Sequence, residues 1–444
     1  MKHLFFALSL LIFCPLTAAK KETLVAQEST NADEVLFEDS RPDPDMEALK
    51  KWIREKRLIT LKETGGDLSI SGNMRTSFAS INEKKDGIRQ RGVNSASGRP
   101  SRPYNVDFSL LLDYRAERTW SSALLNFKNK MAIQDGTVDK IRLYRAYLGG
   151  RVIAGDTFTF DAELGRRSLG DVFDSKIQFS NLFDGALLRF SKAFEDIGDY
   201  YTTVGVFLIN AAKDYYGYVG EMGFLNIGNT GLFLKGSYID WKKYHPDDPL
   251  DFQFNFRVSQ VLIGYQFTPS FLEKLVRVYS AAAYNDAADP ISKVFTPEVT
   301  GTPTASQQQE LDQINKDPDA KYNWAWYAGV SIGKARKQGD WAIDTNYQWV
   351  SAQAIPDFDA SGIGRGNADG VGTYTRKSAG SIVATNILNS VGSGNYHGWV
   401  FRTLYAFSNN ITLSQKFELA GTLDQNIGPN LNYKKFQVEF IFTF

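Results

Sequence analysis

The chain has 444 residues, in which 50 basic side chains balance 50 acidic ones, so its formal net charge at pH 7 is zero. This balance argues against a nucleic-acid-binding protein and against a polycationic membrane-binding surface. The single cysteine, Cys14, excludes a framework of intramolecular disulfides.

Residues 1–19 have the features of a secretory signal peptide. Lys2 precedes the apolar run "LFFALSLLIFC", and small residues follow in "LTAAK". This arrangement predicts export and cleavage after Ala19. A membrane anchor is the alternative, but the apolar run is short for the ~30 Å of hydrocarbon that it would have to cross. An exported chain of this length is either a soluble periplasmic protein or an outer-membrane protein.

Residues 20–66 form the predicted periplasmic lead. The first part, 20–45, is polar and has no apolar period. In "MEALKKWIREKRLITLKE", Leu49, Trp52 and Ile53 recur at the spacing of a helix, and two glycines then end the pattern. We therefore expect a short helix in this lead, before a single main domain at 67–444.

Beyond the predicted helix the apolar period changes to two. In "DTFTFDAELG", for example, Phe158, Phe160 and Leu164 alternate with Thr159 and Asp161. Such alternation is typical of strands, and these runs approach the ~9–11 residues that a tilted membrane strand needs. The predicted strands are 67–80, 104–116, 119–132, 139–150, 156–167, 182–193, 200–212, 215–227, 230–242, 253–268, 274–286, 322–334, 340–353, 397–407, 410–423 and 432–444.

Short turns such as "NIGNTG" and "KQGD" alternate with longer connections, of which 81–103, 287–321 and 354–396 are the longest. Short turns at one end and long loops at the other are typical of outer-membrane barrels, and tryptophans near the strand ends agree with two interfacial girdles. Near residues 258–261 the alternation shifts, as it would at a bulge or a misplaced strand boundary.

The chain ends in "KKFQVEFIFTF", where Phe436, Val438, Phe440, Phe442 and Phe444 occupy every second position. Because no water satisfies backbone groups in lipid, strands survive there only in a closed cylinder. The sequence therefore predicts an all-β fold, a transmembrane antiparallel β-barrel of about sixteen strands, preceded by the short periplasmic helix.

Several segments resemble the chlamydial-type outer-membrane porins, which are related to the carbohydrate-selective porins. They are the polar lead and helix before "LSISGNMRTSF", the strand "RLYRAYLGG", the stretch "ELGRRSLGDVFDS" and the terminal "VEFIFTF". The resemblance implies a homotrimer in the cell outer membrane that passes small hydrophilic solutes, with sugars as a preference, by passive diffusion. It also implies that Phe444 is part of the signal read by the outer-membrane assembly machinery.

If the apolar face of each strand contacts lipid, the opposite face lines the interior. Charges of both signs are expected there in a water-filled channel, whereas a packed interior does not tolerate them unpaired. The basic residues on this face are Arg75, Arg115, Lys128, Lys130, Arg145, Arg167, Arg189, Lys235, Arg257, Arg277, Arg402, Lys416 and Lys435. The acidic residues are Asp107, Asp113, Asp161, Glu163, Glu221, Asp344, Glu418 and Glu439.

Five of these basic residues belong to the first six predicted strands and are expected to form one basic wall: Arg75, Lys128, Arg145, Arg167 and Arg189. The connection after the fifth strand carries Asp171 and Asp174, and the resemblance implies that it folds inward to face this wall. We expect these seven residues to line the solute path, where a transverse field favours anions or polar solutes. The alternative is that the charges are merely solvated or paired within the wall.

The remaining alternatives concern function. Inward-facing Tyr147, Tyr279 and Tyr327 offer ring faces for sugars, with interior packing as the competing interpretation. No enzyme activity, cofactor or metal is expected, because no nucleophile–base motif occurs and His245 in "YHPDDP" is more simply part of a polar loop. An adhesin or structural barrel that acts through its long outer loops stays open as the second class.

Overall fold

The computed structural model describes residues 59–63, 66–95, 100–129, 140–195, 197–210, 215–242, 256–288, 290, 302, 308, 312, 319–356, 359–363, 394–424 and 430–444. The predicted signal peptide and most of the predicted periplasmic lead fall outside these ranges. So do residues 130 and 245, and large parts of the longest connections.

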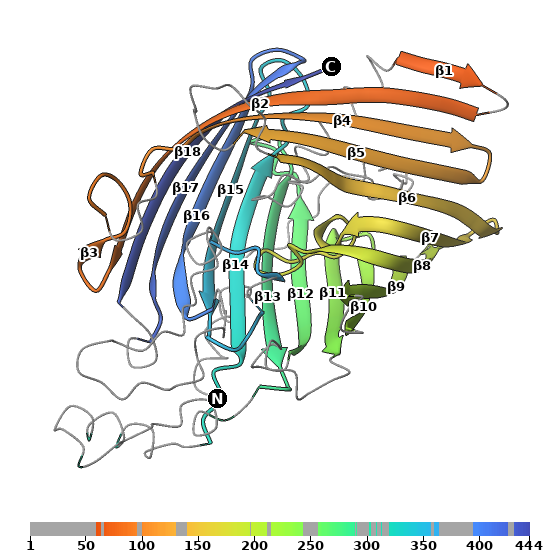
Figure 1. The fold of residues 1–444 in the computed structure, drawn as a ribbon. Helices are drawn as coiled ribbons and strands as arrows, with labels where there is room; N and C mark the ends of the chain where they lie inside the picture. The colour runs from red at the N-terminus through yellow and green to blue at the C-terminus, as the bar shows by residue number, and fades with distance from the viewer. Residues whose placement is uncertain are drawn as a thin grey trace. The chain divides into compact units, whose positions relative to one another are not determined.

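Within the described residues, sixteen strands pair in chain order and close into one antiparallel ring, as the period of two predicted (Figure 1). They are β2 (Gly66–Lys85), β4 (Tyr104–Ala116), β5 (Thr119–Asn129), β6 (Lys140–Ala154), β7 (Phe158–Ser168), β8 (Leu182–Phe194), β9 (Gly198–Asn210), β10 (Tyr215–Ile227), β11 (Leu232–Lys242), β12 (Arg257–Phe267), β13 (Val276–Asn285), β14 (Trp324–Gly333), β15 (Trp341–Val350), β16 (Tyr396–Ala406), β17 (Ile411–Thr422) and β18 (Leu431–Thr443). A two-residue strand, β3 (Ile88–Arg89), pairs with the end of β2.

The last strand closes the ring against the first. β18 pairs with β2 from Leu431 opposite Lys85 to Thr443 opposite Asn73, and Figure 1 shows the blue β18 beside the orange-red β2. The backbone N–H groups of Phe444 and Gly72 then donate to each other's carbonyl oxygens, both at 3.0 Å. This pairing meets the requirement that a strand in lipid have its backbone groups satisfied by neighbouring strands.

Gly72 is required at this seam by close packing. A Cβ atom there would lie 2.6 Å from the Phe444 ring and 2.6 Å from the carbonyl oxygen of Ser109. The Phe444 ring also stacks on Phe108, with ring centroids 6.0 Å apart. The C-terminal aromatic residue is therefore packed across the closing pair of strands and their neighbour β4.

Side chains separate by polarity across the sheet. Met74 and Phe78 on β2 are exposed on the outside, whereas the alternate residues Asn73, Arg75 and Ser77 are buried on the inside. The same alternation recurs around the ring, so exposed apolar side chains cover its outer face. Among the described residues, no helix is both long enough and apolar enough to span a membrane.

The shift in alternation near residues 258–261 is neither a bulge nor a break in pairing. β12 keeps an unbroken register with β11 and with β13. The pattern shifts because Val258 and Leu262 are apolar residues on the inner face, where both are buried in an interior hydrophobic cluster. The rule of polar inside and apolar outside fails where the interior itself is packed.

The predicted helix is wrong at its C-terminal end, where Ile59–Glu63 instead forms a strand, β1. This strand pairs with β2, from Ile59 opposite Ile70 to Glu63 opposite Gly66. The edge of β2 that extends beyond the last residue of β18 would otherwise leave backbone groups unpaired, and β1 satisfies them. The rest of the predicted helix lies outside the described residues.

Candidate functional site

The connection between β7 and β8, residues 169–181, lies inside the barrel. It begins with a short 3-10 turn, η1 (Leu169–Asp171), and four of its apolar side chains are almost fully buried. Leu169, Phe173, Ile177 and Phe179 belong to one hydrophobic cluster with inward-facing residues of the wall such as Phe207. Burial of these side chains, at about 25 cal/mol per Å² of apolar surface, holds the connection against the inner face of the sheet.

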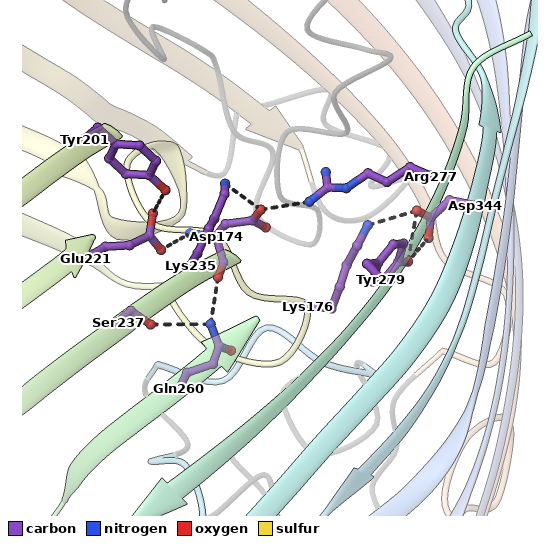
Figure 2. A network of polar contacts seen from close by, with 10 residues as sticks. All are labelled: Asp174, Lys176, Tyr201, Glu221, Lys235, Ser237, Gln260, Arg277, Tyr279 and Asp344. Atoms are coloured by element: carbon purple, nitrogen blue, oxygen red, sulfur yellow. Dashed lines mark hydrogen bonds and ion pairs between the residues drawn. The ribbon is translucent and has the colours of Figure 1, made fainter. Parts of the chain in front are cut away.

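Asp174 is the point where this connection is attached to four neighbouring strands (Figure 2). Its carboxylate Oδ2 accepts from Lys235 Nζ at 2.9 Å and from Arg277 Nη2 at 3.1 Å. Its backbone N–H donates to Glu221 Oε2 at 3.0 Å, and its carbonyl oxygen accepts from Gln260 Nε2 at 2.8 Å. One residue of the connection therefore bonds to β10, β11, β12 and β13.

Lys176 makes the next attachment, two residues further along. Its Nζ lies 3.0 Å from Asp344 Oδ2, and the Tyr279 hydroxyl donates to both oxygens of the same carboxylate at 3.0 and 3.1 Å (Figure 2). The Lys176 carbonyl oxygen accepts from Gln348 Nε2 at 3.4 Å. These contacts extend the attachment of the connection to β15.

A second connection packs on the first. After β15, residues 351–356 and 359–363 are mostly buried rather than exposed on an outer loop. Asp359 accepts from the backbone N–H of Ser180 at 3.1 Å through its carbonyl oxygen, and from that of Asn181 at 3.3 Å through Oδ1. Ser361 donates its N–H to the Ile177 carbonyl at 2.9 Å. The described start of the loop predicted at 354–396 is thus an interior segment, not a surface for adhesion.

Four of the five basic residues predicted to form one wall, Arg75, Arg145, Arg167 and Arg189, lie on the inner face but make separate contacts. Arg75 pairs with Glu439 at 3.3 Å, and fully buried Arg145 pairs with Asp171 at 3.1 Å. Arg167 pairs with Glu163 on its own strand, and its guanidinium lies 4.5 Å from the ring centroid of Tyr147.

Arg189 and Lys128 differ from these three. Arg189 lies over the ring of Tyr201, with 5.7 Å between the guanidinium carbon and the centroid. The backbone of Lys128, on β5, pairs opposite Asp107 on β4, and the side chain of Lys128 lies outside the described structure.

The structure therefore brings Arg145, Arg167 and Asp171 together around Tyr147, but sends Asp174 towards a different part of the wall. The partners of Asp174 are Lys235 and Arg277, which the sequence places on the inner face without assigning them to the site. Lys176 on the connection itself was not singled out either. The alternation of side chains along β11 and β13 was enough to place Lys235 and Arg277 on the inner face. It does not show at what level along the barrel axis they lie, because that level depends on the tilt of the strands.

The three inward tyrosines are packed. Tyr147 is 5% exposed, Tyr279 4% and Tyr327 0%, so none presents a free ring face to the interior. Tyr279 also uses its hydroxyl on Asp344. This burial favours the packing interpretation over stacking with sugars.

No protein-family profile matches the chain, and no curated protein matches it. Among solved structures it is similar to OprB of Pseudomonas putida at high pH, with 10% identity, a TM-score of 0.49, and coverage of 86% of this chain and 94% of that one. It is also similar to Salmonella typhi OmpF in complex with daunomycin, with 9% identity, a TM-score of 0.47, and coverage of 87% and 100%. For the outer membrane channel DcaP of Acinetobacter baumannii the identity is 11%, the TM-score 0.46 and the coverage 86% and 99%. The assignment of the fold rests on the strand pairing of the chain itself.

Proposed function

We propose that this protein is an outer-membrane channel for passive diffusion of small hydrophilic solutes. The observation that carries the proposal is the closed sixteen-strand ring with exposed apolar side chains outside and buried polar and charged side chains inside. A lipid-facing apolar band around a polar interior is the arrangement of a transmembrane β-barrel that conducts water-soluble molecules. A soluble barrel has no need of an apolar outer face.

The two interior connections give the channel its proposed size limit. Residues 169–181, together with 351–356 and 359–363, fill one part of the interior between β8 and β16, and they are held there by hydrogen bonds, ion pairs and apolar packing. Solutes would pass beside this packed region, along a path lined by charged side chains. Width and the charge of the lining then determine which solutes pass.

The proposal also covers how the protein reaches the outer membrane, how it assembles and which solutes it prefers. Export through residues 1–19, delivery to the assembly machinery through Phe444, a homotrimeric state and a preference for anions or sugars are expectations from the sequence. The buried tyrosines give sugars little aromatic surface, so charge is the more promising basis for selectivity.

Reconstitution of the purified, folded protein into planar lipid bilayers tests the proposal. We expect stepwise increases in conductance, each from insertion of one channel assembly. Heat-modifiable gel migration should accompany them as evidence that the inserted protein is folded. Folded protein that inserts without conductance would contradict the channel, and host-cell or ligand binding by that protein would favour the adhesin. Hydrolysis of bound lipid would favour an enzyme.

A further inference from the structure

A row of four polar residues crosses the inner face of neighbouring strands. Arg151 on β6 is opposite Asp161 on β7, Asp161 is opposite Arg189 on β8, and Arg189 is opposite Thr203 on β9. Cross-strand partners share one face of a sheet, so all four project into the barrel. A single carboxylate, that of Asp161, therefore lies between two guanidinium groups.

Asp161 is bound by only one of them. Arg151 Nε lies 2.9 Å from Asp161 Oδ1, and Arg151 Nη2 lies 3.4 Å from Oδ2, so both carboxylate oxygens are engaged. This two-point geometry is the strong form of an arginine–carboxylate pair. Asp161 is 5% exposed and has little freedom to turn towards β8.

Arg189 is left without a carboxylate partner among the described residues. Its guanidinium carbon instead lies 5.7 Å from the ring centroid of Tyr201. The nearby acid Glu221 is occupied, because the Tyr201 hydroxyl donates to its Oε1 at 2.6 Å and the Asp174 N–H donates to its Oε2 at 3.0 Å. Arg189 is also only partly buried.

The other arginines of the predicted wall are different. Arg75, Arg145 and Arg167 are each buried and each paired with a carboxylate. The field of a close ion pair falls off faster than that of a lone charge, so these pairs attract a passing anion less than an unpaired guanidinium does.

We propose that Arg189 is the contact site for anions in this channel, and that Arg151 keeps it available by holding Asp161. The ligand class is an oxyanion, a carboxylate or phosphate group whose two oxygens match the guanidinium fork. The inference rests on the proposed channel function and identifies the residue that carries its selectivity. Because conduction requires release as well as binding, one accessible arginine is better suited to transit than a cluster.

The first test uses the full-length protein in planar bilayers, with inorganic phosphate added to a chloride electrolyte. In wild type, phosphate should reduce the chloride current in a concentration-dependent way. In Arg189→Gln the half-blocking phosphate concentration should rise about tenfold, the loss of one charged hydrogen-bonded contact. The reversal potential under a salt gradient should also shift towards cation selectivity.

Lys192→Gln is the matched control. Lys192 is on the same strand with the parity of outward-facing Leu188, and its Nζ lies 4.7 Å from the ring centroid of Phe194. The substitution removes the same charge from the outer face, so it should leave both readings near wild type. Equal shifts in Arg189→Gln and Lys192→Gln would overturn the inference, because selectivity would then depend on the total charge of the protein and not on Arg189.

A second variant tests the role of Arg151. Arg151→Gln frees Asp161 to pair with Arg189, so it should reproduce most of the loss of phosphate block although Arg189 is unchanged. Adding Asp161→Asn to that variant should restore the block. Channels that conduct in wild type but show no phosphate block, or a block unaffected in Arg189→Gln and Arg151→Gln, would refute the anion site. Absence of any wild-type conductance would instead refute the channel.

Discussion

Asp174 and Arg277 are 103 residues apart in the sequence, and their side chains form a 3.1 Å ion pair across the interior of the barrel. Lys235 binds the same carboxylate oxygen at 2.9 Å. Two cations therefore share one acid on the connection, and the attachment of residues 169–181 to the wall depends on that charge.

The first prediction is that Asp174→Asn loosens this attachment. The substitution retains the size and backbone bonds of the residue but leaves Lys235 and Arg277 without their shared countercharge. Charged hydrogen bonds of this kind contribute about 1.5–3 kcal/mol each. We expect larger current noise and a shift towards anion selectivity in single-channel recordings. Asp184→Asn makes the same change in an exposed outer pair with Arg166 and should leave the recordings unaltered.

The second prediction concerns the contact between the two interior connections. Asp359→Ala removes the acceptor for the Asn181 N–H, at the end of the first connection, and leaves a fully buried site without its side chain. We expect passage of larger sugars in liposome swelling assays. Asp340→Asn is the control, since Asp340 Oδ2 accepts from the backbone of Arg336 and Lys337 in a short turn. An identical increase in both variants would mean that lost stability, not the interior contact, widens the path.

The third prediction separates stability from selectivity at Arg145. Its side chain is 1% exposed and pairs with Asp171, which is 3% exposed, so Arg145→Gln removes a charged partner from a buried carboxylate. Removing one partner of a buried pair costs about 3–5 kcal/mol of unfolding free energy. Urea unfolding followed by heat-modifiable migration should detect this loss. Arg257→Gln breaks a pair with Asp286 that is almost half exposed, and should cost about 1 kcal/mol or less.

The fourth prediction tests the closing seam. Gly72→Ala places a methyl group against the Phe444 ring and a backbone oxygen of β4, so the fraction of protein that folds into the closed barrel should fall sharply. Gly236→Ala on β11 is the matched control, because a Cβ there meets nothing within 4 Å. Heat-modifiable migration after refolding measures both. Equal yields from the two variants would show that the seam tolerates displacement of Phe444.

The strands could be predicted from sequence because each outward position must be apolar, which imposes a period of two on every strand. Their ends were less certain: β2 extends to Lys85, so Lys84 and Lys85 are strand residues and not part of the first outer loop. At this end of β2 the outward-facing side chains are no longer apolar, so the period of two is lost. The strand continues because its backbone pairs with β18.

The site was only partly predictable. The inward folding of residues 169–181 followed from resemblance, and the sequence placed Lys235 and Arg277 on the correct face. The sequence could not identify them as partners of Asp174, because strand tilt determines which residues lie at the same level inside a barrel. The inward turn of residues 351–356 and 359–363 was missed, since their apolar side chains have neither strand nor helix period.

β1 and β18 lie end to end on the same edge of β2. β18 occupies that edge from Lys85 to Asn73, Phe444 takes Gly72, and β1 begins opposite Ile70. If β18 slipped by two residues along β2 towards Ile70, it would need the backbone groups of β2 that already pair with β1. Strand number and the stagger between first and last strands together determine the diameter of a closed barrel, so β1 opposes a slip that would change it. Five residues outside the ring thus help to decide how wide the ring is.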